Sequence, residues 1–558
     1  MIGLYSIGDM PIGEVDASLS VFQQAALLPV ADRVYCLEVE VSPTVLAGAT
    51  ADGTMGDWPI GDTLAAFNAL SAGTLYYSDR GYISLPSDTL SNVYFDGRLK
   101  VPLSIDRSIP LSPLRGNRVS LQLGAITVNN LDRELDNVAQ NYSVDGRRVV
   151  VKMGLQGQPY GEFGTVFSGV SANWLDDERE VRIVVRDTAY KMYTPLQASL
   201  YLGTGGAEGN SNIQGQPKPM AFGKVLNLSP VLVDPSNNIY QFHSRLAQAV
   251  DAVYDQGAAL TPAADYANYA ALAAASISAG TFGTCLAEGL VKTGSNPVGV
   301  LTMDVRGDAN VSYVDTAGAI AKRMLIDFGS VSSSDITTSF ETVDTNTIGW
   351  YSGSNSYTVY EAVNEIMGGV CAWWGNNRLG QYISGIISAP DPTDLIADLD
   401  VSDIIDVEQI NLPDELDPPV YRWRLGYQRN WTVQRGEDLA GSVTQTRKQF
   451  LKDEARVATA TDPTVAVTFS LAQDAPLLQT LYDSSSVAQS KADSLLALYK
   501  VRRQFLKVTL RTQVHLYEPN QNIEITWPRF GLATGKVFRI IGIGENCETR
   551  QGTLVLWG

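Results

Sequence analysis

The chain has 558 residues, of which 45% are hydrophobic and 18% charged, and its formal net charge at pH 7 is −19. At roughly 100–200 residues per domain, this length predicts about three or four domains with sizeable cores. The acidic balance excludes tight binding of nucleic acid, because such binding needs lysine and arginine to displace counterions from the phosphates. Passage of DNA along a surface that does not hold it is compatible with this charge.

The amino-terminal sequence and the cysteines indicate the compartment. MIGLYSIGDM lacks the basic start and apolar stretch of a signal peptide, and no run of about 18 apolar residues predicts a membrane span. Cys36, Cys285, Cys371 and Cys547 are widely spaced and form no C-x-x-C pair, which argues against a zinc or thioredoxin-like site. We expect a protein made in a cytoplasm, with isolated reduced thiols.

Strand patterns dominate the first third of the chain. Residues 33–43 alternate apolar and polar side chains, as a half-buried strand does, and residues 80–105 give strands separated by turns. Two strand-like runs, TVFSGVSANW and EVRIVVRD, lie on either side of the polar LDDER and predict a β-hairpin within 163–187. With the strand-like stretches before it, this hairpin predicts a small antiparallel barrel or sandwich over about residues 106–202.

The composition changes in the middle of the chain. Residues 201–223 are rich in Gly, Asn, Gln and Pro, which predicts a long loop or linker. The alanine-rich stretch 242–291 contains the helix candidates RLAQAVDAVYD and YANYAALAAASI, with short strands as the alternative. Two firmer helices follow, at 316–329 and at 358–369, and the second begins with the spacing of a capping box. It leads into 370–387, where two apolar runs around a polar turn predict a hairpin.

The last third begins with an acidic, proline-containing stretch, residues 388–419, which we interpret as a connector into a second β domain. There, PVYRWRLGYQRNWTVQ predicts a long strand, and residues 484–504 predict an amphipathic helix. Four strand-like runs with short turns end the chain: FLKVTLRTQVHL, NIEITW, KVFRIIGIGEN and GTLVLWG.

Two glycine-rich stretches resemble nucleotide-binding loops without completing the motif. GLATGKV (531–537) is one residue short of a phosphate-binding loop and has Val537 in place of the hydroxyl, so we interpret it as a turn. GTGGAEG (203–209) has Glu208 where a dinucleotide-binding loop needs its third glycine. No Gly-x-Ser-x-Gly nucleophile motif is present in the sequence.

The titratable residues form no complete catalytic set. The only two histidines, His243 and His515, have no metal-ligand spacing, and we expect both to be structural. A glycosidase needs two carboxylates across a sugar bond. The acidic clusters instead fall in the predicted hairpin turn and in the connector, where solvated charge is expected and weak calcium binding is a minor alternative. These clusters are Asp176, Asp177 and Glu178, and Asp391, Asp394, Asp398, Asp400, Asp403 and Asp406.

Trp373 and Trp374 offer a surface that could stack on a sugar, but packing in a core is the expected role for a strand that follows a helix. We therefore predict no catalytic, cofactor-binding or metal-binding residues, and no cofactor.

One stretch in the middle, GQPKPMAFGKVLNLSPVLVDPSNNIYQFH (215–243), has Lys-Pro, Phe-Gly, Asn and Pro before a Tyr-Gln-x-His end. In this pattern it resembles the hub proteins of tail tips and baseplates, found in long-tailed bacteriophages and gene transfer agents and related in plan to the T-even baseplate hub. Further similar stretches are DGRLKVPLSIDRSIPLSP (96–113), GAITVNNLDRELD (124–136), DGRRVVVKMG (145–154), LTMDVRGD (301–308) and the closing residues 531–558. The resemblance covers most of the chain from about Asp96 and brings no catalytic residues.

This resemblance implies a fold and a role. Such hubs are generally homotrimers, in which two barrel-like domains per subunit form a pseudo-sixfold ring that adapts the sixfold tail tube to a threefold tip. The implied partners are two further copies of the chain, the distal tail or tail tube protein ring, the tape measure protein, and central spike or tail fibre proteins. The implied location is the tail tip of a virion. An acidic channel wall would suit the passage of DNA, because it would not trap a polyanion.

We therefore expect an α+β, β-rich chain in which two antiparallel β-barrel-like hub domains flank a mixed α+β centre. The expected parts are 1–205 (an N-terminal segment and the first barrel), 206–243 (a Gly/Pro-rich linker), 244–390 (the centre), 391–419 (an acidic connector) and 420–558 (the second barrel, with one helix). The expected function is structural and not enzymatic, in a tail tip that DNA passes through. A tail-associated cell-wall hydrolase and a receptor-binding tail protein are the alternatives.

Overall fold

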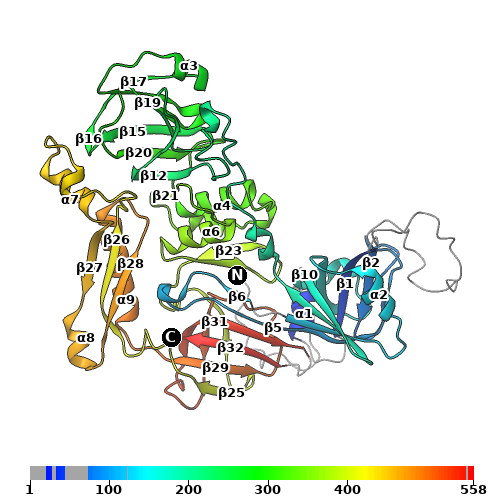
Figure 1. Ribbon diagram of the computed structural model, residues 1–558. Helices are drawn as coiled ribbons and strands as arrows, with labels where there is room; N and C mark the ends of the chain where they lie inside the picture. Colours follow the sequence, from blue (N-terminus) through cyan, green and yellow to red (C-terminus); the bar gives the residue numbers. More distant parts are fainter. Residues whose placement is uncertain (1–19, 28–32, 44–72, 122–123, 548–550) are drawn as a thin grey trace, which may run out of the picture.

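The computed structural model describes residues 20–27, 33–43, 73–121, 124–547 and 551–558, and it is rich in antiparallel strands (Figure 1). The fold class is α+β and β-rich, as expected. We distinguish a first β unit, a second β unit, a central unit and a lateral unit, each defined below by its strands and helices.

The first β unit comes from the amino-terminal third. Its strands lie in the order β2-β1-β9-β10-β11-β7-β5, and their alternating inward residues, such as Val149, Val151 and Met153, form one core. The main elements are α1 (Val21–Leu27), β1 (Arg33–Pro43), β2 (Gly73–Ser78), β5 (Leu99–Ser108), β7 (Gly124–Asn129), α2 (Asp136–Asn141), β9 (Arg148–Leu155), β10 (Gly164–Asp176) and β11 (Glu180–Arg186). Short strands β3 (Tyr82–Ile83), β4 (Tyr94–Phe95), β6 (Ser120–Leu121) and β8 (Tyr142–Ser143) extend its margins.

The second β unit comes mainly from the carboxy-terminal end. Its strands are β24 (Leu395–Leu399), β25 (Ile404–Gln409), β29 (Phe505–Leu510), β30 (Asn522–Ile525), β31 (Lys536–Asn546) and β32 (Gln551–Trp557). Ile404, Val508, Ile523 and Phe538 belong to its core. The four strands predicted at the end of the chain are confirmed as β29 to β32.

The two β units lie side by side, blue and red in Figure 1, and share one fifteen-stranded sheet. They join where β5 pairs β31. Within the described residues this sheet is an open path and neither unit closes into a barrel, which corrects the expected barrels. The reason is that β5 contributes Leu99 and Leu103 to the first core but gives its free edge to β31 instead of to β1.

The central unit combines two five-stranded sheets with helices and rises from the β units in Figure 1. Its strands are β12 (Met220–Leu228), β13 (Val231–Asp234), β14 (Ile239–Gln241), β15 (Ala247–Asp255), β16 (Ala258–Ala259), β17 (Thr261–Asp265), β18 (Thr281–Cys285), β19 (Leu290–Thr293), β20 (Leu301–Asp308), β21 (Gly349–Ser352), β22 (Trp373–Asn376) and β23 (Tyr382–Gly385). Its helices are α3 (Tyr269–Ala274), α4 (Ala317–Asp327), α5 (Ser339–Thr342) and α6 (Val359–Gly368).

The lateral unit packs a three-stranded sheet against a long helix. Its elements are β26 (Val420–Tyr427), α7 (Gln445–Lys452), β27 (Arg456–Thr461), α8 (Pro463–Thr468), β28 (Gln473–Gln479) and α9 (Ser485–Tyr499). Trp423 of β26 lies against Tyr499 of α9, with ring centroids 5.5 Å apart. This corrects the expected 420–558 domain, because its first half forms a sheet of its own and only its last strands belong to the second β unit.

Two segments expected to be irregular contain core strands. Only the first part of the expected linker 206–243 is a loop; from Met220 onward it forms β12 to β14, and Met220 and Phe222 are fully buried. The expected acidic connector 391–419 supplies β24 and β25, in which Val407 is buried. Acidic residues occupy the outward positions of β25, which concealed its strand character.

The alanine-rich stretch is largely β-structure. RLAQAVDAVYD, a helix candidate, is strand β15, which pairs with β20 along its whole length. The second candidate contains a helix of six residues, α3, with Asn268 as its N-cap. Pairing with a neighbouring strand here outweighs the helix propensity of alanine.

The firmer helices and the hairpins agree with the structure. α4 and α6 lie in the predicted ranges, and Thr358 and Glu361 form the predicted capping box. The hairpins β10–β11 and β22–β23 are present with their polar turns. None of the helices that the structure describes has the length and apolar character needed to cross a membrane.

Candidate functional site

The two β units have the same order of strands, although their sequences show no repeat. In the first unit the order is β1-β9-β10-β11-β7-β5, and in the second it is β24-β30-β31-β32-β29-β25. When β2 and the short strands β3, β4, β6 and β8 of the first unit are set aside and the six remaining strands of each unit are numbered along the sequence, both orders are first, fourth, fifth, sixth, third, second. All neighbours are antiparallel, except that β24 runs parallel to β30. The chain therefore carries one sheet topology twice.

The junction between these units is made by the backbone. Ser104–Ser108 of β5 pair with Gly542–Asn546 of β31 in antiparallel register. The other half of the same edge of β31 is occupied by β30, which ends its pairing at Arg539. One strand of the second unit thus has two neighbours on one edge, and one of them comes from the first unit.

A buried ionic cluster lies beside this junction. We call it the junction cluster: Arg107 from β5, Arg378 from the turn between β22 and β23, and His515, Glu518 and Glu545 from the second unit. Arg107, Arg378, His515 and Glu545 are each at most 6% exposed. The cluster therefore ties the first β unit, the central unit and the second β unit together.

Its geometry pairs two arginines with two carboxylates. Arg107 Nη1 lies 2.8 Å from Glu518 Oε2, and Arg378 Nε lies 2.6 Å from Glu518 Oε1. Arg378 Nη2 is 3.3 Å from Glu545 Oε1, and the same oxygen is 3.7 Å from Arg107 Nη2. Arg378 also donates to the carbonyls of His515, Val514 and Tyr517.

Burial and charge act against each other at Glu545. Burial favours the neutral acid, but the positive charge of Arg378, a hydrogen bond from His515 and the charge of Arg107 together hold the pKa of Glu545 at about 2. Burial lowers the pKa of His515, which disfavours its protonation. The carboxylate is thus kept ionised as a counter-ion in the interior of the molecule.

Each histidine is buried, with one ring nitrogen hydrogen-bonded and the other facing a carboxylate. His515 Nε2 lies 3.1 Å from the Tyr35 hydroxyl, and its Nδ1 lies 3.4 Å from Glu545 Oε2. His243 Nδ1 accepts from the amide of Ala221 at 3.0 Å, and its Nε2 faces Asp308 Oδ1 at 3.4 Å. Neither ring therefore presents a free nitrogen to a substrate, as a general base must do.

Asp308 is the centre of a second buried cluster, in the central unit. Arg245 Nη2 and Arg323 Nη1 lie 2.7 and 2.8 Å from its two oxygens. Burial raises the pKa of Asp308, but the hydrogen bond from His243 and the two arginines lower it overall. Because Arg323 lies on α4 and Asp308 ends β20, this cluster fixes the helix to the sheet.

The acidic residues singled out in the sequence do not converge. Asp176, Asp177 and Glu178 are exposed at the β10–β11 turn, where Asp177 accepts from the turn amides of Arg179 and Glu180. In the connector, Asp391 and Asp400 cap local turns, and Asp403 is the buried member of the set. No group of three His, Cys, Asp or Glu side chains suited to a metal ion occurs in the described ranges.

The four cysteines are all buried and free, in agreement with the expectation of isolated thiols. Trp373 and Trp374 are also buried, at 4% and 0% exposure, and therefore pack in the core instead of offering a surface for a sugar. GLATGKV covers the end of the loop between β30 and β31 and the first two residues of β31, and the GTGGAEG stretch contains a short 3-10 turn, Gly206–Glu208.

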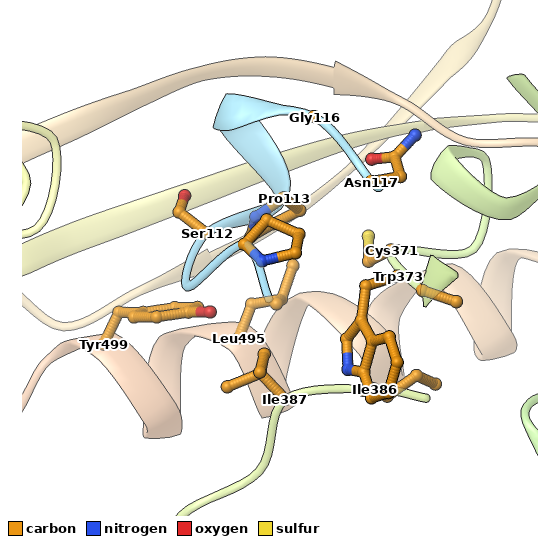
Figure 2. Close-up of a pocket in the computed structure, with 12 residues that line it drawn as sticks. Ser112, Pro113, Gly116, Asn117, Cys371, Trp373, Ile386, Ile387, Leu495 and Tyr499 are labelled. Atoms are coloured by element: carbon orange, nitrogen blue, oxygen red, sulfur yellow. The ribbon is translucent and has the colours of Figure 1, made fainter. Parts of the chain in front are cut away.

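A small pocket lies where the loop after β5 meets α9 and the central hairpin (Figure 2). Ser112 and Pro113 come from the loop, Leu495 and Tyr499 from the helix, and Trp373 from the hairpin. Its volume is about 20 Å³, which is room for about one water molecule. A wider cleft of about 410 Å³ lies between the β units, and it includes Asp79, whose carboxylate accepts from the Tyr35 amide.

Apart from His515, which was expected to be structural, the residues of the junction cluster were not anticipated from the sequence. Arg107 and Glu545 are charged residues inside runs with otherwise strand-like apolar spacing, SIDRS and GIGEN. A buried charge needs a partner of opposite sign, so two such positions in distant strands were a usable signal. The pairing of β5 with β31 could not be predicted from the sequence, because backbone hydrogen bonds between strands do not depend on the side-chain composition.

No family model and no curated protein matches the chain. Among solved structures, a tail protein from Neisseria meningitidis matches with 11% identity and a TM-score of 0.39, covering 86% of this chain and 96% of that one. The prophage MuSo2 43 kDa tail protein from Shewanella oneidensis matches with 10% identity and a TM-score of 0.35, covering 84% and 95%. A chain of the native gene transfer agent virion matches with 12% identity and a TM-score of 0.41, covering 62% and 84%.

Proposed function

We propose that this chain is a structural hub protein of a phage-type tail tip, in which three copies form a ring with six β units around a central channel. The observation that carries the proposal is the repeated strand order of the two β units, which lie edge to edge in one chain. Two units of one topology in each subunit give a threefold assembly six similar positions. Such a ring can face a sixfold tube on one side and a threefold tip on the other.

The sequence resemblance to hub proteins supports the same role from a separate direction. The stretch 215–243, which carries the most specific pattern, forms β12 to β14 and the turn to His243 in the central unit. His243 in turn is held by the Asp308 cluster. The residues that resemble the family are therefore structural, and this suits a protein whose role is to hold a shape.

Composition supports a channel that does not retain DNA. The net charge of −19 gives each copy an acidic field, and three copies would strengthen it. In this proposal the distal tail or tube ring, the tape measure protein and the spike or fibre proteins contact the ring at its faces. The chain's own contribution is rigidity, supplied by the shared sheet and the buried clusters.

Immunogold electron microscopy tests the tail-tip location. Antibodies against the purified chain are applied to particles released from cells that produce it, and particles from a strain lacking its gene serve as the control. We expect gold at the distal end of the tails, and tails missing or incomplete in the deletion strain. Label along the tail shaft or on capsids, or normal tails without the gene, would contradict the proposal.

A further inference from the structure

Among the strand edges that are open in the β units of the described chain, those of β10 and β25 have paired equivalents inside the chain. β11 pairs the second half of β10, but on the other edge β9 pairs only the first half and ends opposite Val170. From Ala172 to Asp176 that edge of β10 has no neighbouring strand among the described residues. β25 ends the path of the shared sheet and pairs β29 on one side only.

Both open edges carry apolar side chains that face solvent. Leu175 on β10 is 50% exposed and Ile405 on β25 is 41% exposed. Exposed strand edges of this kind are templates for pairing with another chain. Their exposure in a single copy is therefore a reason to look for a second chain that covers them.

Inside the chain, the equivalent edges are already paired. β31 has the position in the second unit that β10 has in the first, since each is the fifth strand of its unit along the sequence. β5 and β25 are equivalent in the same way, as the second strands. The part of β31 beyond Arg539, where β30 ends, is the part that β5 occupies. The open part of β10 therefore corresponds to the part of β31 that pairs with β5, Gly542–Asn546.

The pairing registers define which residues would meet. Ser104 is the last residue of β5 that pairs with β7 and the first that pairs with β31. Gln409 is the corresponding residue, because it is the last of β25 that pairs with β29. By this equivalence, Gln409–Pro413 would run antiparallel to Ala172–Asp176, with Gln409 beside Asp176.

Charged side chains border both edges. Exposed Asp406, Glu408 and Asp414 precede and follow the Gln409 segment, and none has an ion-pair partner among the described residues. The edge of β10 is bordered by charges of both signs: the exposed arginines Arg148, Arg179 and Arg182, which have no ion pair in the described part, and the exposed carboxylates of the β10–β11 turn, Asp176, Asp177 and Glu178. The arginines would attract the acidic segment and the three carboxylates of the turn would repel it, so the strand pairing, and not the charge, supports the contact.

We propose that β25 and the residues after it, through Asp414, add as an antiparallel strand to the open edge of β10 in a second copy of this chain. The contact repeats between copies the β5–β31 junction that exists within each copy. The closed ring rests on the proposed function, and the interface between its subunits is formed by β10 of one copy and β25 of the next.

Cysteine cross-linking of the full chain tests this interface. The double variant Asp176→Cys and Gln409→Cys places two thiols at residues that would face each other, where antiparallel partners lie about 4.5–5.5 Å apart at their Cα atoms. The native cysteines are buried and give little background. We expect mild oxidation to give covalent dimers and trimers on denaturing gels. The matched control joins Asp176→Cys with Val457→Cys, which is 49% exposed on β27 of the lateral unit and should not cross-link.

The outcomes separate this inference from the tail-tip proposal. If the protein is a trimer in solution but the double variant gives no covalent dimer or trimer on the gel, the proposed interface is wrong and the tail-tip location stands. The same holds if the control pair cross-links equally well. A purified protein that stays monomeric also overturns the proposed interface. Absence of the chain from tails in the immunogold experiment would instead contradict the proposed function, whatever the cross-linking shows.

Discussion

At the scale of single residues, the molecule depends on charges that are buried and compensated. Glu545 is 3% exposed and faces two arginines and a histidine from different units. Pairing ions in the interior seldom adds much stability over an apolar core, but removing one partner is costly. The relative position of the first β unit, the central unit and the second β unit therefore depends on the carboxylate of Glu545.

Replacement of this carboxylate gives the first prediction. Glu545→Gln leaves Arg107 and Arg378 with only Glu518 as a counter-ion, so we expect the free energy of unfolding to fall by about 3 kcal/mol. Urea denaturation followed by tryptophan fluorescence measures this change. The matched control is Glu454→Gln, since Glu454 is 58% exposed and lies 3.9 Å from Arg429; its loss should be below about 1 kcal/mol. Equal effects of the two variants would contradict the role of the cluster.

The buried histidines make stability depend on pH. Burial lowers the pKa of both His243 and His515 below the ordinary value of 6.5. As pH falls below about 6.5, the unfolded chain takes up protons that the folded chain does not, so stability decreases. We expect each histidine to contribute a slope of up to about 1.4 kcal/mol per pH unit between pH 6.5 and its folded pKa.

Urea denaturation at several pH values between 7 and 5 measures that slope, and His243→Gln and His515→Gln should each reduce it. Glu545 acts in a lower window: its folded pKa of about 2 lies below the unfolded value, so its contribution is complete above about pH 4.5 and is lost as pH falls toward 2. A stability that does not change between pH 7 and 5 would contradict the neutral, buried state of the histidines.

At the scale of elements, local sequence signals determined the helices better than the strands. The capping box of α6 is one such signal: Thr358 Oγ1 accepts from the Glu361 amide at 3.2 Å, and Glu361 accepts from the Thr358 amide at 2.8 Å. Both bonds lie within three residues and are therefore visible in the sequence. The strand β15 shows the opposite case, because its partner β20 lies about fifty residues away and outweighs the alanine composition.

The capping box leads to a third prediction. Thr358→Ala should cost about 1 kcal/mol of stability, because it leaves an amide of the first helical turn without its side-chain acceptor. Hydrogen exchange of the amides at the start of α6 measures the local effect. Thr338→Ala is the matched control, since Thr338 precedes α5 without a capping hydrogen bond and should change exchange little. Similar changes at both helices would argue against the cap.

Connectivity between units was the part that the sequence could not reveal. The acidic stretch 391–419 gives β24 and β25 because Leu399, Ile404 and Val407 face the core while carboxylates face solvent. Aspartates and prolines at the outward and loop positions hide this alternation. β24 and β25 form strands because they pair with β30 and β29, which lie about a hundred residues further along the chain.

At the scale of the whole molecule, the two β units and their junction are the main feature. The sequence predicted two β domains around a mixed centre; the structure places a lateral unit between that centre and the last strands, and it adds β24 and β25 to the second β unit. The sequence did not predict that the two domains touch, nor that they share a strand order. Strand order is set by backbone pairing and can be kept while side chains change, so a repeated topology leaves no repeat in the sequence.

The clearest test of a ring built from six such units is cryo-electron microscopy of the purified protein, combined with its native mass. We expect three copies around a threefold axis, with six β units at similar radius and β25 of each copy beside β10 of the next. The wall of the channel should be rich in carboxylates, in keeping with the net charge of −19. A monomer, or an assembly in which the two β units of a copy lie at unrelated positions, would contradict the account.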